Sequence, residues 1–109
     1  MKRGDLIIVS ASGDDGKPRP AVILQTAAIP SSHQSVIVCQ LTFELEHNSD
    51  LRVTIEPRPE NGLRLTSQIM SDKPVTIRRN KISQRIGQLS RQGMAKLNKA
   101  LTFCLGLAD

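Results

Sequence analysis

Six short runs of aliphatic and β-branched residues follow one another along the chain at roughly ten-residue intervals. The segments between them are rich in Gly, Pro, Asn, Asp and Ser, the residues that favour turns. This pattern is typical of a small β-barrel or sandwich. The chain has 109 residues, of which 39% are hydrophobic, so we expect one small domain with one core. The predicted strands are residues 5–10, 20–26, 35–41, 51–56, 65–70 and 74–77.

After residue 77 the apolar residues change to a helical period. Ile82, Ile86 and Leu89 recur at four and three residues, and Asn80 is placed to cap a short helix. Ser90 then has the position of the N-cap of a longer helix. The face that this second helix turns to the core is predicted to consist of Met94, Leu97, Leu101, Cys104 and Leu105. The overall expectation is a mainly β fold closed by a C-terminal helix.

The composition excludes several classes of protein. The chain has no Trp, no Tyr and only two Phe, which excludes a nucleic-acid site built on a platform of stacked aromatic rings. No apolar run approaches the roughly eighteen residues of a membrane span, and no signal-peptide core follows the N-terminus. We therefore expect a cytoplasmic protein with no membrane partner.

Cysteine and histidine do not indicate a metal site. Cys39 and Cys104 stand alone in apolar stretches and are predicted to be buried, reduced thiols. His33 and His47 lie in turn-like segments, where a surface role is the commoner one. Because no metal-ligand spacing joins these residues, a metal-dependent nuclease is disfavoured, and we expect no metal and no cofactor.

Positive charge is concentrated in the C-terminal part of the chain. Residues 63–109 hold nine Lys and Arg against two Asp, whereas residues 1–62 hold six Lys and Arg against eight Asp and Glu. A basic face of this kind can attract a phosphate backbone or an acidic protein segment. It can equally be the solvated surface of a helix.

The segment KPRPAVILQ, residues 17–25, places Arg19 between two prolines and directly before an apolar run. Pro18 and Pro20 can fix a turn from which Arg19 points into water, or the guanidinium can have a function. The local sequence leaves both interpretations open.

Five segments in order give the chain a family resemblance. They are KRGDLIIVS, KPRPAVILQ, SVIVCQLT, SQIMSDKPVTIRRNKI and IGQLSRQGMAKLNKALTFCLGL. Together they resemble the MazF/PemK/Kid family of toxin endoribonucleases over nearly the whole chain. The resemblance implies one toxin domain, residues 1–109, with an SH3-like β-barrel and a C-terminal α-helix. It also implies a homodimer that cleaves single-stranded mRNA at specific short sequences without a metal and is inhibited by an acidic cognate antitoxin.

The resemblance also gives Arg19 and Thr42 catalytic roles, because family members place an arginine and a threonine at these points. In such cleavage the RNA 2′-hydroxyl attacks the adjacent phosphorus and leaves a 2′,3′-cyclic phosphate. A guanidinium can bind the charged phosphoryl oxygens bidentately, and a threonine hydroxyl can donate a hydrogen bond to one of them or orient the attacking hydroxyl. Arginine stays protonated in proteins, so Arg19 is assigned to charge stabilisation and not to proton abstraction.

Asp72 is the predicted proton acceptor, because SDKPVTI resembles a family segment whose aspartate is proposed as the base. Asp72 can equally be a turn residue before Lys73 and Pro74. Two residues earlier, many relatives have an arginine used in catalysis or RNA binding, and this chain has Met70. Either Arg19 carries the phosphate alone or Lys73 compensates.

The remaining predicted residues bind RNA. They are Lys17, Thr66, Gln68, Lys73 and Arg79. Thr66 and Gln68 match positions that line the RNA groove in relatives, and they can equally be ordinary strand residues.

Two alternatives belong to other classes. CcdB-type toxins share the barrel and poison DNA gyrase through a Trp-Gly-Ile ending, whereas this chain ends in residues 105–109, LGLAD, and has no Trp. An inactive relative that only binds RNA or antitoxin is the other alternative, and Met70 is its main support.

Overall fold

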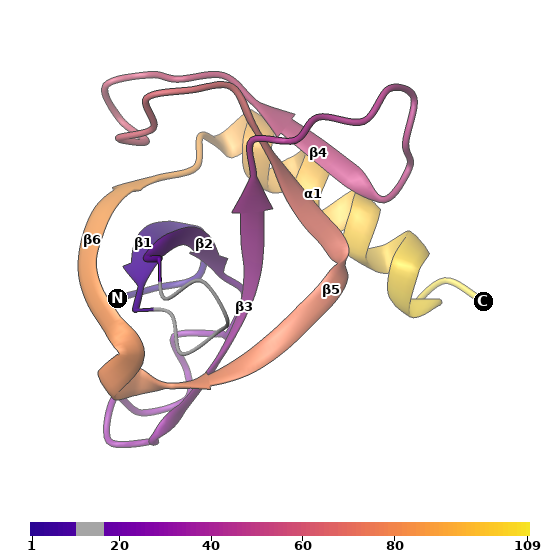
Figure 1. Ribbon diagram of the computed structural model, residues 1–109. Coiled ribbons are helices and arrows are strands. Elements are labelled where there is room, and N and C mark those ends of the chain that lie inside the picture. Colours follow the sequence, from indigo (N-terminus) through magenta and orange to yellow (C-terminus); the bar gives the residue numbers. More distant parts are fainter. Residues whose placement is uncertain (11–16) are drawn as a thin grey trace.

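The computed structural model describes residues 1–10 and 17–109, and in these it contains six strands, one 3₁₀ turn and one long helix (Figure 1). Of the turn predicted at residues 12–17, the structure describes only Lys17. The elements are β1 (Asp5–Val9), β2 (Arg19–Ile23), β3 (Ser35–Thr42), β4 (Arg52–Ile55), β5 (Ser67–Arg78), η1 (Arg79–Lys81), β6 (Ile82–Gln88) and α1 (Arg91–Leu105).

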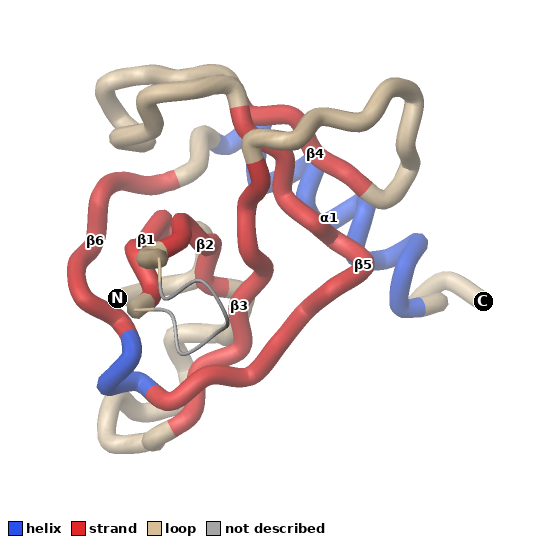
Figure 2. The backbone as a smooth tube through the Cα atoms, in the orientation of Figure 1, coloured by secondary structure: helices blue, strands red, loops and turns tan. Residues whose placement is uncertain are grey.

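The six strands form one antiparallel sheet in the order β4-β5-β3-β2-β1-β6. The sheet curls strongly, and α1 packs against β4 and β5 (Figures 1 and 2). Among the described residues no pairing joins the edge strands β4 and β6, so the barrel-like sheet is not closed. The predicted mainly β fold with a C-terminal helix is confirmed.

Buried side chains gather on both sides of the sheet because successive residues of a strand point to opposite faces. In β3, Val36 and Val38 belong to one apolar cluster, whereas Cys39 and Leu41 belong to the other, which includes residues of α1. The first cluster fills the curl of the sheet, and the second fixes the helix.

The helix begins where the sequence predicts. The Ser90 side chain accepts a hydrogen bond from the backbone N–H of Gly93 (3.0 Å), which caps the first turn. Leu97 and Leu101 are buried as predicted, and Met94 and Cys104 are partly buried. Leu105 is 55% exposed, so its predicted place in the core face is wrong.

The helix predicted around residues 80–89 is also wrong. Residues 79–81 form the 3₁₀ turn, and residues 82–88 form β6, which pairs with β1 across two register shifts. The four-residue spacing of Ile82 and Ile86 is typical of one helix face. In β6, however, Ile82 packs against the first apolar cluster and Ile86 against the second, and β6 has two register shifts with β1. Backbone pairing with β1, which would otherwise be an open edge, explains why the strand forms.

The strands predicted at 65–70 and 74–77 are one continuous strand, β5. The intervening SDK segment, residues 71–73, is predicted as a turn but lies within β5. It lies opposite the point where the register with β3 shifts, between Cys39 and Leu41. The extra residues are accommodated by this irregularity in the ladder and not by a reversal of the chain. Asp72 is therefore a strand residue.

Candidate active site

Arg19 and Thr42 stand at the ends of neighbouring strands, as the first residue of β2 and the last of β3. The β2–β3 ladder ends with Ala21 opposite Gln40, and the same register continued by two residues would set Arg19 opposite Thr42. Residues directly opposite in an antiparallel pair point to the same face, with Cβ atoms about 5 Å apart. In this register a guanidinium and a hydroxyl would be within reach of one phosphate group.

The polar row extends across two further strands. Thr42 faces Gln68 of β5, and Gln68 faces Thr54 of β4. The Gln68 Nε2 group donates to Thr54 Oγ1 (3.1 Å), which shows that their side chains share a face. Four strands thus contribute one polar residue each to this row.

The Thr42 hydroxyl already has a partner within the protein. Its Oγ1 atom accepts a hydrogen bond from the backbone N–H of Glu44 (3.1 Å). Because a hydroxyl has one proton to donate as well as lone pairs to accept, this contact leaves the Thr42 proton for another acceptor.

Thr66 and Gln68, two of the predicted RNA contacts, are both engaged with other protein groups. Thr66 Oγ1 donates to Glu56 Oε1 at 2.6 Å. Gln68 is buried, and its amide makes four hydrogen bonds, to residues of β4 and of the loop after β3. Their predicted RNA contacts would have to compete with these bonds.

Asp72 has surroundings different from those of Thr42. Its carboxylate pairs with Lys73 Nζ at 3.4 Å. Burial, together with the neighbouring Cys104 and Asp72, raises the pKa of the Cys39 thiol to about 11, and burial followed by the Asp72 charge raises the pKa of Cys104. Both thiols are free. The hydrogen bond and ion pair given for Asp72 are with Lys73, and none of the contacts of the described residues joins Asp72 to Thr42.

The other predicted RNA contacts lie apart from one another. Lys17 is exposed, two residues before Arg19. Arg79 lies next to the start of β3, where Ser35 faces Arg78, and its Nε atom donates to the His33 carbonyl (2.9 Å). Seven residue steps along β3 separate Ser35 from Thr42, a distance on the order of 23 Å. Arg79 would therefore contact a different part of a bound RNA.

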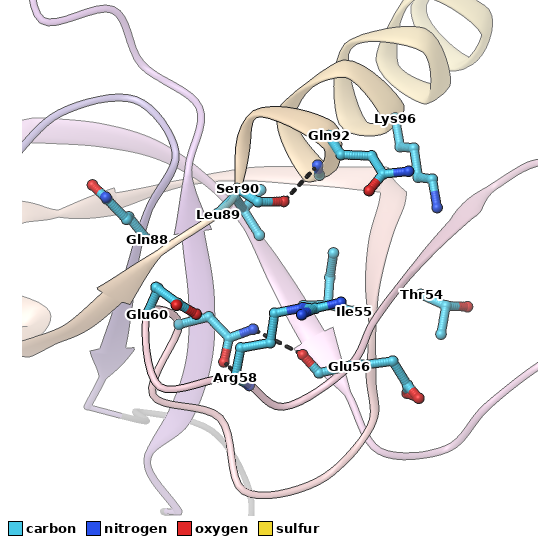
Figure 3. Close-up of a pocket in the computed structure, with 12 residues that line it drawn as sticks. Thr54, Ile55, Glu56, Arg58, Glu60, Gln88, Leu89, Ser90, Gln92 and Lys96 are labelled. Carbon is cyan, nitrogen blue, oxygen red and sulfur yellow. Dashed lines mark hydrogen bonds between the residues drawn. The ribbon is translucent and has the colours of Figure 1, made fainter.

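A cavity of about 230 Å³ lies between the loop after β4 and the start of α1 (Figure 3). Asn61 shapes the loop, since its side chain bonds the backbone of Arg58, Leu63 and Glu56. Gly87 lets the loop approach β6, because a Cβ atom there would lie 2.4 Å from the Glu60 carbonyl oxygen. None of the predicted catalytic or RNA-binding residues lines this cavity, and its walls carry both cations and carboxylates.

The described residues hold neither a metal-binding cluster nor a membrane-spanning helix. No group of three or more His, Cys, Asp or Glu side chains in this part of the chain could hold a metal ion. None of its helices has the length and apolar character needed to cross a membrane.

Comparison with known proteins identifies the family. Residues 2–105 match the family described as PemK-like, MazF-like toxin of type II toxin-antitoxin system. The chain belongs to this toxin family. The match includes every residue of the polar row, and the predicted family resemblance is confirmed.

A curated relative supports the enzymatic assignment. The chain is 37% identical over 109 residues to "Probable endoribonuclease MazF" of Mycolicibacterium smegmatis, with 99% of each chain covered. The predicted class, a MazF-family endoribonuclease toxin, is thus confirmed at the level of the family.

Solved structures show the same fold. A mycobacterial endoribonuclease in complex with its cognate antitoxin superposes with a TM-score of 0.82 at 21% identity, covering 98% of this chain and 96% of that one. The Mycobacterium tuberculosis toxin MazF-mt6 gives 0.80 at 22% identity, covering 94% and 96%. MazF in a MazE-MazF crystal of Deinococcus radiodurans gives 0.79 at 17%, covering 97% and 95%.

Sequence reasoning did not find Arg52. Its side chain is only 11% exposed, and it bonds Gln68 and two residues of the loop after β3. In the sequence Arg52 stands in a predicted strand, LRVTIE, where a charged residue is an ordinary surface feature. The only local signal is the cation at the start of a short apolar strand.

Proposed function

We propose that this toxin cleaves single-stranded mRNA at specific short sequences by attack of the RNA 2′-hydroxyl on the adjacent phosphorus. The bond from phosphorus to the 5′-oxygen of the next nucleotide breaks, which leaves a 2′,3′-cyclic phosphate and a 5′-hydroxyl. The proposal is supported by the register of β2 and β3, in which Ala21 faces Gln40; continued by two residues, this register sets Arg19 opposite Thr42.

Arg19 and Thr42 together meet the needs of the transition state. Negative charge collects on the phosphoryl oxygens, where a guanidinium fork can bind two of them. The Thr42 proton, left over by the hydrogen bond from Glu44, is available to a phosphoryl oxygen. Since Arg19 supplies the positive charge, the reaction as we propose it requires no metal ion.

Asp72 remains our candidate for the proton acceptor. Its carboxylate lies 3.4 Å from Lys73 Nζ, and a carboxylate oxygen can take a proton from the 2′-hydroxyl. Because Asp72 is not joined to Thr42 by any described contact, the RNA would have to bridge the two, or the carboxylate would have to act from a second copy of the chain.

We further propose that Lys17, Lys73 and Arg79 contact the RNA backbone. Each carries a positive charge, and phosphate contacts of this kind supply most of the affinity that does not depend on sequence. Met70 occupies the position of a family arginine and faces Arg52 across β4 and β5. In this proposal Met70 changes rate and sequence preference, and the class of reaction stays the same.

A homodimer and an acidic antitoxin complete the proposal. Phe103, Leu105 and Leu107 are more than half exposed at the end of α1, and a two-fold contact between copies would cover them. Light scattering at micromolar concentration should show twice the 12.0 kDa mass of one chain; a monomeric mass would exclude the dimer.

The acidic antitoxin would bind near the same cations as the RNA. Antitoxin carboxylates would compete with phosphate for Arg19 and the nearby lysines. With mRNA as substrate, we place the toxin in the cytoplasm.

The decisive experiment removes the nucleophile. Replacing the 2′-hydroxyl with hydrogen at the cleaved nucleotide should abolish cutting, while binding of the substituted RNA should stay close to that of the parent RNA. EDTA should leave the rate unchanged. Cleavage at the substituted nucleotide, or a requirement for Mg²⁺, would exclude this mechanism. Binding to DNA gyrase that traps it on cleaved DNA, with no cleavage of RNA, would favour the gyrase-poison alternative.

A further inference from the structure

The loop between β3 and β4, residues 43–51, is held by a buried amide. The Oε1 atom of Gln68 accepts from the backbone N–H of Glu46 (2.9 Å), and its Nε2 atom donates to the Glu46 carbonyl (3.0 Å). The Nε2 atom also donates to Thr54 Oγ1 (3.1 Å), and the Oε1 atom also accepts from Arg52 Nη1 (3.3 Å). An amide has two donor hydrogens and two acceptor lone pairs, so Gln68 has none left over.

Arg52 holds the same loop from β4. Its Nη1 atom donates to the Glu44 carbonyl (3.2 Å) and to Gln68 Oε1, and its Nη2 atom donates to Glu46 Oε1 (3.0 Å). The Arg52 side chain is only 11% exposed, whereas Glu46 is 55% exposed, so the guanidinium reaches the loop from the sheet side. Without Arg52, the Glu44 carbonyl would lose its bond to β4.

The two side chains are connected to Thr42 through Glu44. Arg52 binds the carbonyl of Glu44, and the N–H of Glu44 donates to Thr42 Oγ1. The bond from the Glu44 N–H occupies one lone pair of the Thr42 hydroxyl. It thereby limits the directions in which the hydroxyl proton of Thr42 can point. Moving Glu44 would release the hydroxyl to rotate.

We propose that Arg52 and Gln68 are positioning residues, which clamp residues 43–51 so that Glu44 holds the Thr42 hydroxyl with its proton directed at the scissile phosphate. The inference rests on the proposed function, since it gives the clamp a role in that reaction. Gln68 thereby acts through the loop, in place of the direct RNA contact predicted from the sequence. Small displacements of a reacting group are enough to reduce a rate, even when the change that causes them lies outside the reacting groups.

The test is a double-mutant cycle with Thr42→Val, which removes the hydroxyl and keeps the shape of the side chain. In the wild-type background, Arg52→Met should lower the single-turnover cleavage rate at saturating protein by about 10-fold. Affinity for the non-cleavable 2′-deoxy RNA should change by less than about 3-fold, because the clamp does not touch the substrate. In the Thr42→Val background, Arg52→Met should have no further effect on rate.

A merely structural role predicts a different result. If Arg52→Met lowers the rate by the same factor with and without the Thr42 hydroxyl, the clamp does not act through that hydroxyl and the inference is wrong. A wild-type protein that does not cleave RNA contradicts the proposed function itself, which separates the two failures. Arg91→Met is the matched control: it removes the same charge at the exposed start of α1 and should leave the rate unchanged.

Amide hydrogen exchange tests the clamp without using activity. In Arg52→Met and in Gln68→Met the Glu44 and Glu46 amides should exchange faster than in the wild type, whereas the β1–β2 pairing should keep its protection. If Arg52→Met does not fold, Gln68→Met replaces it in the cycle. The expected result is the same: a lower cleavage rate in the wild-type background and no further effect in the Thr42→Val background. Unchanged exchange at both loop amides in a folded variant overturns the proposal.

Discussion

The two ends of β3 present polar side chains that are held to different degrees. At the Thr42 end, Gln68 and Arg52 bond one another and the following loop, and Glu44 fixes the hydroxyl. At the Ser35 end, Arg79 bonds the His33 carbonyl beside a cavity of about 450 Å³, and its neighbours Arg78 and Asn80 are exposed.

This difference indicates at which end of β3 we expect the cleavage reaction and at which end we expect RNA binding. Catalytic groups act best when they are fixed before the substrate arrives, because no reorganisation is then needed in the transition state. Phosphate binding depends mainly on charge and tolerates mobile side chains. We therefore propose that the reaction takes place at the Thr42 end and that the Arg79 end binds part of the RNA backbone.

Arg19→Ala should give the largest effect, because it removes the positive charge from the transition state. We expect the cleavage rate to fall by about 10²-fold or more, with a much smaller loss of RNA affinity. Single-turnover kinetics with saturating protein measure the rate apart from binding. If Arg19→Ala keeps wild-type turnover, Arg19 is a turn residue and the two ends of β3 do not differ in the way described.

Arg79→Ala should give a smaller effect of another kind. The loss of one phosphate contact should weaken RNA binding several-fold and reduce the slope of log K against log salt by about 0.7, the value for one contact to a single strand. Binding titrations at several salt concentrations measure this slope. A fall in saturated cleavage rate comparable to that of Arg19→Ala would instead place Arg79 in the reaction and remove the contrast between the ends.

The elements that the sequence predicted correctly are those with a local cause. Ser90 caps α1 through a bond to Gly93, three residues away, and β1 to β4 are short apolar runs between turn residues. The sequence does not predict β6, because the spacing of Ile82 and Ile86 is that of one helix face, whereas pairing with the distant β1 forms a strand in which they pack against different clusters.

The candidate site shows the same limit. Arg19 and Thr42 could be named from the family resemblance, yet their alignment follows from the register of β2 and β3. Arg52 joins Glu44 to Gln68, a residue sixteen positions further on, and no spacing in the sequence predicts such a contact. Long-range side-chain bonds of this kind require the sheet order to be known.

The most direct test of the account is the chemistry of the RNA ends that cleavage leaves. Purified toxin incubated with single-stranded RNA in EDTA should produce a 2′,3′-cyclic phosphate on one fragment and a 5′-hydroxyl on the other, identified by mass spectrometry of the fragments. That result is the one expected when the 2′-hydroxyl is the nucleophile and Arg19 supplies the charge. Fragments ending in a 3′-hydroxyl and a 5′-phosphate would show that water attacked the phosphorus, and would contradict the account.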